Sequence, residues 1–570
     1  MRYIGRQRAL PCLVFGTSGR LGVPRMPPLV TLRKNSQVKS RLVFCALAAL
    51  SVPTAFAQPR ISRVQNIYSY ILPGMPNYGI AQGSIFDIVG TGLATATSDL
   101  QSVPLPRTLN GASVSVTVNG TTTQAILYYV SDVQIDAILP SATPTGTGQI
   151  TVTVNGKPST PAGITVLQSA FGMLTLNAVG NGPAAVFDLN ANYLGLTNAA
   201  NPGDFITLWG SGVGPVIGDE TAIQAAVNLT DIPIEVDIGG IPATVLYAGR
   251  GYYPGLDVIN VVVPPGVAGC HVSVVVRSRG IVSNFATIPV AASGRTCSEP
   301  VTGLTTTQIQ TLLSRPVINR GVINFSGDDS SSNVDVTFSR FTNAQYALRQ
   351  PVGAVSFGSC TVFNFTNQNM AVPNPPALRP VLLDAGPSIS FTATSDTGVG
   401  NASLPFQDGG YSISGLPGVK SFRGTYSFAG SGGPDIGAFS AQLTLPGGGS
   451  SYISSTLNNV TSVTRSQGLT VIWTPPGNPD SDLLFIQISG FSFVLNAPFG
   501  AQFVCNVPLA AGRFTIPPAV LLALPPQLSG ATPQAQLEID LIITKQFTAP
   551  GVDVGTINWV TPSIQQFSYQ

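Results

Sequence analysis

The sequence contains a tandem repeat, so any fold assigned to the repeated segment must occur twice. Residues 83–94 read GSIFDIVGTGLA, and residues 203–214 read GDFITLWGSGVG, which is the same pattern 120 residues later. Further segments repeat in the same order. The matching segments are 114–140 with 234–264 and 146–156 with 266–280. A duplication on this scale predicts two equivalent domains in series.

Each copy has the residue pattern of short β-strands. The segment VSVTVNG at 114–120 alternates apolar with polar residues and ends in Asn-Gly. Alternation with a period of two indicates strands with one buried face, and Asn-Gly favours the two-residue turn of a hairpin. Several such strands without a helical period between them are typical of an immunoglobulin-like sandwich. We predict an all-β fold with tandem immunoglobulin-like β-sandwiches at 58–170 and 171–296.

Composition and charge agree with this class and exclude one kind of partner. Apolar residues make up 44% of the chain, which is enough for a buried core, and 61 Gly and 47 Pro supply turns. Residues 1–57 hold nine Lys/Arg and no Asp/Glu; the rest of the chain holds 18 Lys/Arg against 25 Asp/Glu. Proteins that bind nucleic acid need clustered Lys/Arg to neutralise phosphates. We therefore predict no nucleic acid partner.

Both copies carry a Gly-x-Gly sequence directly after an apolar strand, at 90–92 and 210–212. Such a loop binds phosphate when it leads into a helix, because the N-terminal N–H groups of the helix then face the anion. Here the loops lead into segments rich in Pro, Ser and Thr that have no helical period. We interpret these glycines as turn residues and predict no nucleotide or other cofactor.

The first 57 residues have the organisation of a secretory signal peptide. Lys39-Ser40-Arg41 precede the apolar stretch LVFCALAALSV at 42–52, and an A-F-A triplet at 55–57 matches a cleavage site. The apolar stretch is shorter than the roughly 20 residues that span a membrane. The tract before it is long for a signal peptide, so Met26 is an alternative start of translation. We predict cleavage after Ala57 and a secreted or cell-surface protein without a transmembrane segment.

Four cysteines follow the predicted cleavage site: Cys270, Cys297, Cys360 and Cys505. An even number in an exported protein indicates disulfides, and no Cys-x-x-Cys spacing indicates zinc. Cys270 opens one predicted strand and Cys297 follows the next. A hairpin that turns near residues 279–280 would place both at the same end. We predict the disulfide Cys270–Cys297 and, from the remaining pair, Cys360–Cys505.

The second half of the chain returns to strand patterns after a linker at 297–318. Within the linker, Thr305 and Gln308 before Ile309 fit the capping box of a short helix, although Thr-rich coil fits equally well. Segments such as NVDVTFSRF, SISFTATS and QLEIDLIITKQF then alternate with turn sequences. We predict a larger β-sandwich-like region at 319–570, as one domain or as two.

Few residues are available for catalysis. His271 is the only histidine, and it lies beside Cys270 at the start of a predicted strand. A Ser-His-Asp or Cys-His site would have to use it, and sites with several histidine ligands are excluded. Asp396-Thr397-Gly398 copies the aspartic-protease triplet, but it occurs once, whereas that chemistry needs two aspartates. We predict that the protein is not an enzyme.

Calcium is the one metal for which candidate ligands occur. The loops GDDSSSNVD at 327–335 and NPDSD at 478–482 gather the oxygen ligands that Ca²⁺ prefers. The candidates are Asp328, Asp329, Asp335, Asp480 and Asp482. Neither loop matches an EF-hand, and solvated polar turns are the commoner explanation of such segments.

Several segments together resemble a known family. IAQGSIFDIVGTGLA, LPRTLNGASVSVTVNG, YYVSDVQIDAILP and NAANPGDFITLWGSGVGPV are similar to segments of large secreted acidobacterial proteins with paired IPT/TIG-like immunoglobulin modules. The resemblance covers about residues 60–295, and residues 300–570 resemble an adjoining all-β module. It implies a sandwich fold and an extracellular location. The function of these modules is uncharacterised, so the resemblance implies no catalytic residues.

These observations favour an exported, non-catalytic protein with a binding, adhesion or scaffold role and an unidentified protein or glycan partner. The first alternative is a carbohydrate-binding protein, with Tyr128-Tyr129 or Tyr252-Tyr253 as an aromatic platform. Tyr128 and Tyr129 are consecutive in a strand, so one of them must face the core. The second alternative is a secreted hydrolase that uses two carboxylates.

Overall fold

The computed structural model describes most of the chain after residue 57. The described residues are 58–100, 102–327, 332–349, 353–366, 376–395, 398–416, 424–445, 460, 462–474, 484–495, 497–527, 535–561 and 564–570. The predicted signal peptide at 1–57 lies outside these residues, and so do Asp328, Asp329, Asp396, Asp480 and Asp482. Within the described part, the helices are too short or too polar to cross a membrane.

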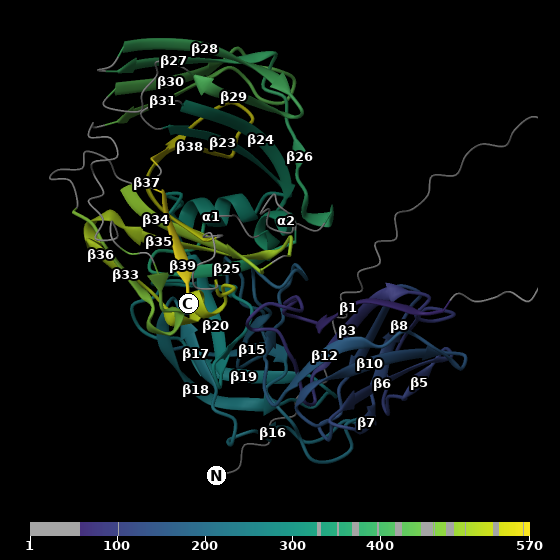
Figure 1. The fold of residues 1–570 in the computed structure, drawn as a ribbon. Coiled ribbons are helices and arrows are strands. Elements are labelled where there is room, and N and C mark those ends of the chain that lie inside the picture. Colours follow the sequence, from purple (N-terminus) through teal and green to yellow (C-terminus); the bar gives the residue numbers. More distant parts are fainter. Residues whose placement is uncertain are drawn as a thin grey trace, which may run out of the picture. The chain divides into compact units, whose positions relative to one another are not determined.

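The first sandwich consists of two sheets that pack face to face (Figure 1). One sheet has the strand order β1-β3-β9-β8-β4 and the other β2-β12-β10-β6-β5, with β7 beside β6 and β11 beside β10. Its strands are β1 (Arg60–Asn66), β2 (Ile80–Ala81), β3 (Ile85–Thr91), β4 (Ser98–Asp99), β5 (Thr108–Leu109), β6 (Ala112–Val118), β7 (Thr121–Gln124), β8 (Ile126–Val130), β9 (Gln134–Ile138), β10 (Gly146–Val154), β11 (Lys157–Pro158) and β12 (Ala162–Leu167).

The predicted alternation forms the core of this sandwich. Val114 and Val116 of β6 are fully buried, and β6 pairs with β10 so that Val116 lies opposite the buried Ile150. Phe86 and Ile88 of β3 meet them from the other sheet in the same apolar cluster. The all-β fold class predicted from the sequence is therefore confirmed.

The second sandwich repeats this arrangement with one continuous ladder, β13-β15-β19-β18-β17-β20-β21. The long strand β18 connects its two layers, because its first residues pair with β17 and its last with β19. The strands are β13 (Gly172–Met173), β14 (Val186–Asp188), β15 (Phe205–Ser211), β16 (Val227–Asn228), β17 (Glu235–Ile238), β18 (Ile241–Arg250), β19 (Asp257–Val262), β20 (Gly269–Ser278), β21 (Ile281–Val282) and β22 (Ala286–Val290).

The two Gly-x-Gly sequences lie at equivalent turns, after β3 and after β15. Gly92 has φ +66° and Gly212 has φ +110°, a backbone conformation that favours glycine. In the described residues each turn leads into loop and a short strand, β4 or β16, and no helix begins at either one. The interpretation as turn residues is confirmed for Gly92 and Gly212, whereas Gly90 and Gly210 lie within β3 and β15.

A short helix follows the second sandwich. Helix α1 (Thr306–Leu313) begins at Thr305, whose side chain accepts from the N–H of Gln308 while the Gln308 side chain accepts from the N–H of Thr305. This is the capping box predicted from the sequence, so the helix forms and the coil alternative is wrong here. Ile309 and Leu312 bury one face of the helix against the domains on either side.

Both predicted disulfides are present. Cys270 lies in β20, which pairs with β22 as a hairpin, and Cys297 lies just beyond β22, bonded to Cys270. Cys360 and Cys505 face each other directly across β25 and β35. The first bond ties the second sandwich to the segment that leaves it, and the second ties two strands of the C-terminal region together.

The C-terminal region is built on a mixed sheet of 15 described strands, in which β23 and β38 pair in parallel. Its elements are β23 (Val317–Gly327), β24 (Ser332–Thr342), α2 (Asn343–Leu348), β25 (Cys360–Phe365), η1 (Pro376–Leu378), β26 (Val381–Leu382), β27 (Ser388–Ser395), β28 (Gly398–Gln407), β29 (Gly410–Leu416), β30 (Gly424–Gly430), β31 (Phe439–Leu445), β32 (Ser462–Val463), η3 (Arg465–Gln467), β33 (Leu469–Ile472), β34 (Leu484–Phe493), β35 (Gly500–Pro508), η4 (Leu509–Ala511), β36 (Arg513–Ile516), α3 (Pro518–Leu522), β37 (Ala535–Phe547), β38 (Val554–Thr561) and β39 (Ile564–Tyr569).

This sheet folds back on itself around one core. Strands β23 and β27 are four steps apart in the ladder, which would separate them by about 19 Å in a flat sheet. The rings of Phe325 in β23 and Phe391 in β27 are nevertheless only 5.6 Å apart. Figure 1 shows the layer of β27, β28, β30 and β31 above β23 and β24. The aromatic residues between the layers form the main apolar core.

Candidate functional site

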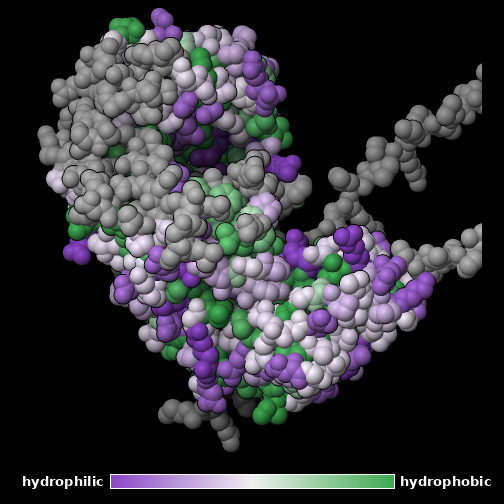
Figure 2. Space-filling model, viewed as in Figure 1, coloured by the Kyte–Doolittle hydropathy of each residue, from purple (hydrophilic) through white to green (hydrophobic). Residues whose placement is uncertain are grey.

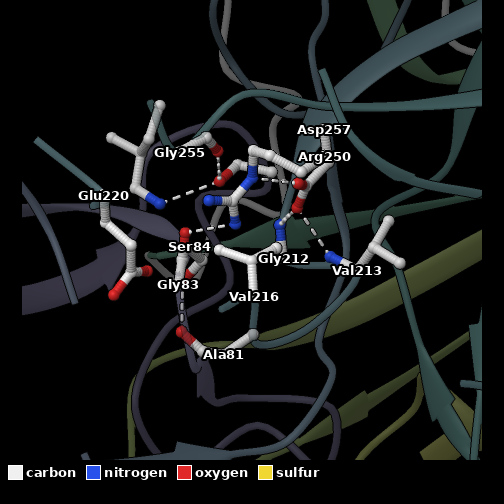
Figure 3. Close-up of polar contacts among 12 residues, drawn as sticks. Ala81, Gly83, Ser84, Gly212, Val213, Val216, Glu220, Arg250, Gly255 and Asp257 are labelled. Carbon is white, nitrogen blue, oxygen red and sulfur yellow. Dashed lines mark hydrogen bonds and ion pairs between the residues drawn. The ribbon is translucent and has the colours of Figure 1, made fainter. Parts of the chain in front are cut away.

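The Gly-x-Gly turn of the second sandwich binds an anion, and this anion is a carboxylate of the chain itself. The N–H groups of Gly212 and Val213 donate to Asp257 Oδ2 at 2.6 and 2.8 Å. Arg250 Nε donates to Asp257 Oδ1 at 2.7 Å, and both side chains are buried. Figure 3 shows the four residues close together; Gly212 and Val213 follow β15, and Arg250 and Asp257 belong to β18 and β19. The turn therefore uses its free N–H groups to hold an internal ion pair.

The same ion pair connects the two sandwiches. Arg250 Nη2 donates to the carbonyl oxygen of Gly83 in the first sandwich at 2.7 Å (Figure 3). Gly83 has φ +72°, and a Cβ atom there would lie 2.8 Å from Arg250 Nη2. Ser211 extends the connection, because its Oγ accepts from the N–H of Ile85 and donates to the carbonyl of Gly255. Arg250, Asp257, Gly83 and Ser211 form what we call the junction network.

A second set of contacts lies beside the junction network. Glu220 of the second sandwich accepts from Ser141 of the first, from its hydroxyl at 2.7 Å and from its N–H at 2.8 Å. The N–H of Val216 donates to the same Ser141 hydroxyl at 2.9 Å. Hydrogen bonds to a carboxylate are among the stronger ones in proteins. The sandwiches are thus joined by several specific polar contacts rather than by a bare linker.

Two buried aspartates lie opposite each other on the first sandwich. Asp87 in β3 and Asp136 in β9 are direct cross-strand partners and are 4% and 8% exposed. Burial raises the pKa of Asp87 to about 8 and that of Asp136 to about 7, and each is further raised by a neighbouring carboxylate. Gln65 donates to Asp87, and Gln134 donates to Asp136 at 2.7 Å. We call Asp87 and Asp136 the acid pair.

The second copy of the repeat shows that the acid pair is not required by the fold. At the equivalent positions it has Thr207 and Asn260, which are also cross-strand partners. There the Thr207 hydroxyl donates to Asn260 Oδ1 at 2.9 Å, a neutral contact. Sequence reasoning overlooked the acid pair and found no paired carboxylates. The available signal was a single Asp in the middle of each apolar run, IFDIV and QIDAI.

His271 is buried between the second sandwich and the C-terminal region. Its Nε2 lies 3.9 Å from Glu299 Oε2, and its backbone N–H donates to Ser356 Oγ. Burial lowers the pKa of His271 to about 3 and raises the pKa of Glu299 to about 8, so burial disfavours charge on both groups. The neighbouring Cys270 is bonded to Cys297 and carries no free thiol. This places His271 in a packing environment rather than beside a nucleophilic cysteine.

A cavity of about 250 Å³ lies where the first sandwich, the second sandwich and the C-terminal region meet. Its polar lining includes one arginine and amide side chains from all three domains: Arg63, Gln65, Asn77, Asn181, Asn284 and Asn364. Its apolar lining includes Phe285 and Phe363. We call it the three-domain cavity.

Several polar atoms of the lining residues have no hydrogen-bond partner among the described residues. These buried atoms are Arg63 Nε, Gln65 Oε1, Asn77 Oδ1 and Asn181 Oδ1. Buried polar groups in native proteins are usually paired with protein or ordered water, and exceptions call for an explanation. The lining therefore retains hydrogen-bonding capacity that the described chain does not use.

The loops around the cavity are held by other amides. Asn66 Oδ1 accepts from the N–H groups of Tyr68 and Ser69, which fixes the loop after β1. Asn284 Nδ2 donates to the carbonyls of Met173 and Gly180, which fixes the loop that carries residues 178–181. The cavity walls are consequently set by specific contacts before any ligand arrives.

The tyrosines proposed as an aromatic platform differ in accessibility. Tyr128 packs against a buried cluster on the outer face of the first sandwich, and Tyr129 is partly buried. Tyr253 is partly buried as well, whereas Tyr252 is 59% exposed. Of these four tyrosines, Tyr252 has the most exposed side chain.

One candidate calcium ligand lies within the part of the chain that the structure describes. Asp335, the described calcium candidate, is exposed on β24, and in the described residues no group of three or more His, Cys, Asp or Glu side chains could hold a metal ion. Exposed apolar residues such as Ile217, Val399 and Leu189 belong to separate elements. Figure 2 shows polar and apolar residues interspersed over the sandwiches on the face in view.

Comparison with known proteins identifies no family for this chain. No protein-family model matches the chain, and no curated protein matches it. One similar solved structure is the full extracellular region of plexin A4, at 10% identity and a TM-score of 0.15; the match covers 80% of this chain and 30% of plexin, under a third of its length.

Two further solved structures have comparable scores. The FN1–FN3 domains of chicken CNTN1 match at 8% identity, 68% coverage of this chain, 98% coverage of that chain and a TM-score of 0.12. SGBP-B of Bacteroides ovatus, solved with a mixed-linkage heptasaccharide, matches at 9% identity, 78% and 94% coverage and a TM-score of 0.13. At these TM-scores the similarities carry no argument about fold or function.

Proposed function

We propose that this chain is a non-catalytic binding or scaffold protein that acts outside the cell. The observation that carries the proposal is the junction network. Arg250 and Asp257 are an ion pair with side chains only 4% and 0% exposed, and Arg250 reaches across to Gly83 of the other sandwich. Domains that move independently have wetter and less specific contacts. A tandem joined in this way presents the loops of successive domains in a defined arrangement, which suits simultaneous contact with one large partner.

Two disulfides support the extracellular part of the proposal, because such bonds persist in oxidising compartments. We retain the predicted signal peptide and the resemblance to secreted acidobacterial proteins with IPT/TIG-like modules as part of the same proposal. The partner is an unidentified protein or glycan. A glycan partner is favoured by one specific feature, the amide-lined cavity between the domains.

A carboxylate-dependent hydrolase is the competing function. The acid pair supplies two carboxyl groups with raised pKa values, as general acid–base chemistry requires. However, both side chains are buried, and neither is among the residues that line the three-domain cavity. A substrate bond in that cavity would not meet either carboxylate directly. We therefore assign the acid pair no catalytic role.

The experiment compares binding and turnover with the same purified protein. Labelled protein is applied to a glycan array and to bacterial cell surfaces, and unlabelled protein is incubated with polysaccharide, peptide and ester substrates. We expect saturable binding and no product. The D87N/D136N variant is the control for catalysis. Turnover that this folded variant loses would overturn the proposal in favour of the hydrolase.

A further inference from the structure

We propose that the three-domain cavity is a binding site for one neutral sugar residue, such as the terminal unit of a glycan. The inference rests on the proposed binding function and names the ligand class. It follows from the chemistry of the cavity lining, the size of the cavity and the charge around it.

The polar part of the lining fits hydroxyl groups on several sides. Gln65 and Asn77 come from the first sandwich, Asn181 from the second and Asn364 from the C-terminal region. An amide side chain both donates and accepts hydrogen bonds, and so does a sugar hydroxyl. A ligand with hydroxyl groups around a ring can therefore pair with amides from all three domains at once.

Unused hydrogen-bonding capacity is concentrated in the same residues. Gln65, Asn77 and Asn181 are 1%, 7% and 3% exposed, and each keeps one amide oxygen without a partner among the described residues. These oxygens accept hydrogen bonds, which sugar hydroxyls can donate. Leaving a buried acceptor without a hydrogen bond destabilises a folded protein, because the acceptor has lost its bonds to water. A ligand or an ordered water that donates hydrogen bonds to these three oxygens removes this penalty.

The apolar lining and the size suit a single ring. Phe285 and Phe363 offer aromatic surface on which the C–H faces of a sugar can pack. The volume of about 250 Å³ is slightly below the roughly 300–1,000 Å³ of sites for drug-sized ligands. The cavity therefore has room for one ring and not for an oligosaccharide.

The charge around the cavity favours a neutral ligand over an anion. Among the described residues that line the cavity, Arg63 alone carries a formal charge. Directly behind the lining, Gln65 donates to Asp87 of the acid pair, so any ionised carboxylate there opposes the field of Arg63. A phosphate or carboxylate ligand would usually find several cationic groups together. Here the recognition groups are amides.

Local backbone conformation gives further support. Tyr70 and Ala178 line the cavity, and both have φ +53°, a left-handed conformation that residues with a side chain rarely adopt. Such conformations persist where the surroundings enforce them and are often found at ligand sites. Tyr70 belongs to a loop of the first sandwich and Ala178 to a loop of the second, and the two loops face each other.

The test is calorimetric titration of the whole purified protein with methyl glycosides of glucose, galactose, mannose and xylose, and with glucuronate and inorganic phosphate as anionic probes. We expect at least one neutral glycoside to bind with one site per chain. N364A should weaken this binding about 5- to 10-fold, as expected for one lost hydrogen bond. V179W, which fills the cavity from its wall, should abolish it. N401A removes an exposed amide on β28, outside the cavity, and should bind like the unaltered protein.

The possible results distinguish failure of the neutral-sugar site from failure of the proposed binding function. Binding of glucuronate or phosphate alone, or of none of the probes, would refute the neutral-sugar site. A glycoside that binds V179W as well as the unaltered protein would place the site elsewhere, although the binding function would stand. Circular dichroism confirms that V179W is folded, and N364A gives an independent reading if it is not. Hydrolysis of a bound glycoside would instead contradict the proposed function.

Discussion

Replacing Asp257 by alanine tests the junction network most directly. The variant leaves the buried guanidinium of Arg250 without a counter-ion and the N–H groups of Gly212 and Val213 without an acceptor. Removing one partner of a buried ion pair costs about 3–5 kcal/mol, and an unpaired buried donor costs about 1–3 kcal/mol. These contributions overlap, because Arg250 keeps its bond to Gly83. We expect the free energy of unfolding to fall by about 4–6 kcal/mol.

The assay is urea denaturation followed by tryptophan fluorescence, with hydrogen exchange of residues 205–213 to assign the transition to the second sandwich. A chain of several domains need not unfold in one step, so the local exchange measurement is essential. D257N keeps one acceptor oxygen but no charge and should lie between D257A and the unaltered protein.

The matched control is an exposed ion pair of similar geometry. Arg277 and Glu235 approach to 2.7 Å, but the Glu235 side chain is 63% exposed. Exposed pairs contribute about 0–1 kcal/mol, so E235A should have little effect. If folded D257A loses no more stability than E235A, the junction network does not stabilise the protein and the reasoning is wrong.

Three further predictions concern the acid pair, a disulfide and the N-terminus. In the folded protein the pKa values of Asp87 and Asp136 are raised to about 8 and about 7. The folded protein therefore binds more protons than the unfolded chain between about pH 4 and about pH 8. Its free energy of unfolding should consequently fall as the pH rises through this range. The D87T/D136N variant, which copies the second repeat, should flatten this dependence in urea titrations at several pH values; an unchanged slope would contradict the assignment. The Cys360–Cys505 bond joins residues that are 145 positions apart, so its removal should lower the free energy of unfolding by about 4–5 kcal/mol if it acts by restricting the unfolded chain. An unchanged melting temperature of the variant without this bond would refute the prediction. Secreted protein should begin at Gln58 on N-terminal sequencing, and material that retains residues 42–52 would exclude the predicted cleavage.

The strands, the repeat and the disulfides could be predicted from sequence because their determinants are local. Alternation in VSVTVNG assigns Val114 and Val116 to a buried face through geometry within one strand. The 120-residue repeat transfers that assignment to the second copy. Cys270 and Cys297 flank one hairpin, so strand order alone brings them together. The cap of helix α1 was visible for the same reason, since Thr305 and Gln308 are three residues apart.

The junction network, the acid pair and the three-domain cavity were decided by the tertiary structure alone. Arg250 and Gly83 are 167 residues apart, and no periodicity links them; they meet because two sandwiches dock. The sequence placed Asp87 and Asp136 in strands, but only the strand order β3-β9 and its register set them opposite each other. A buried polar group finds its partner on whichever surface packs against it. Which partner it finds depends on how the domains pack, and it cannot be deduced from the sequence of a single strand.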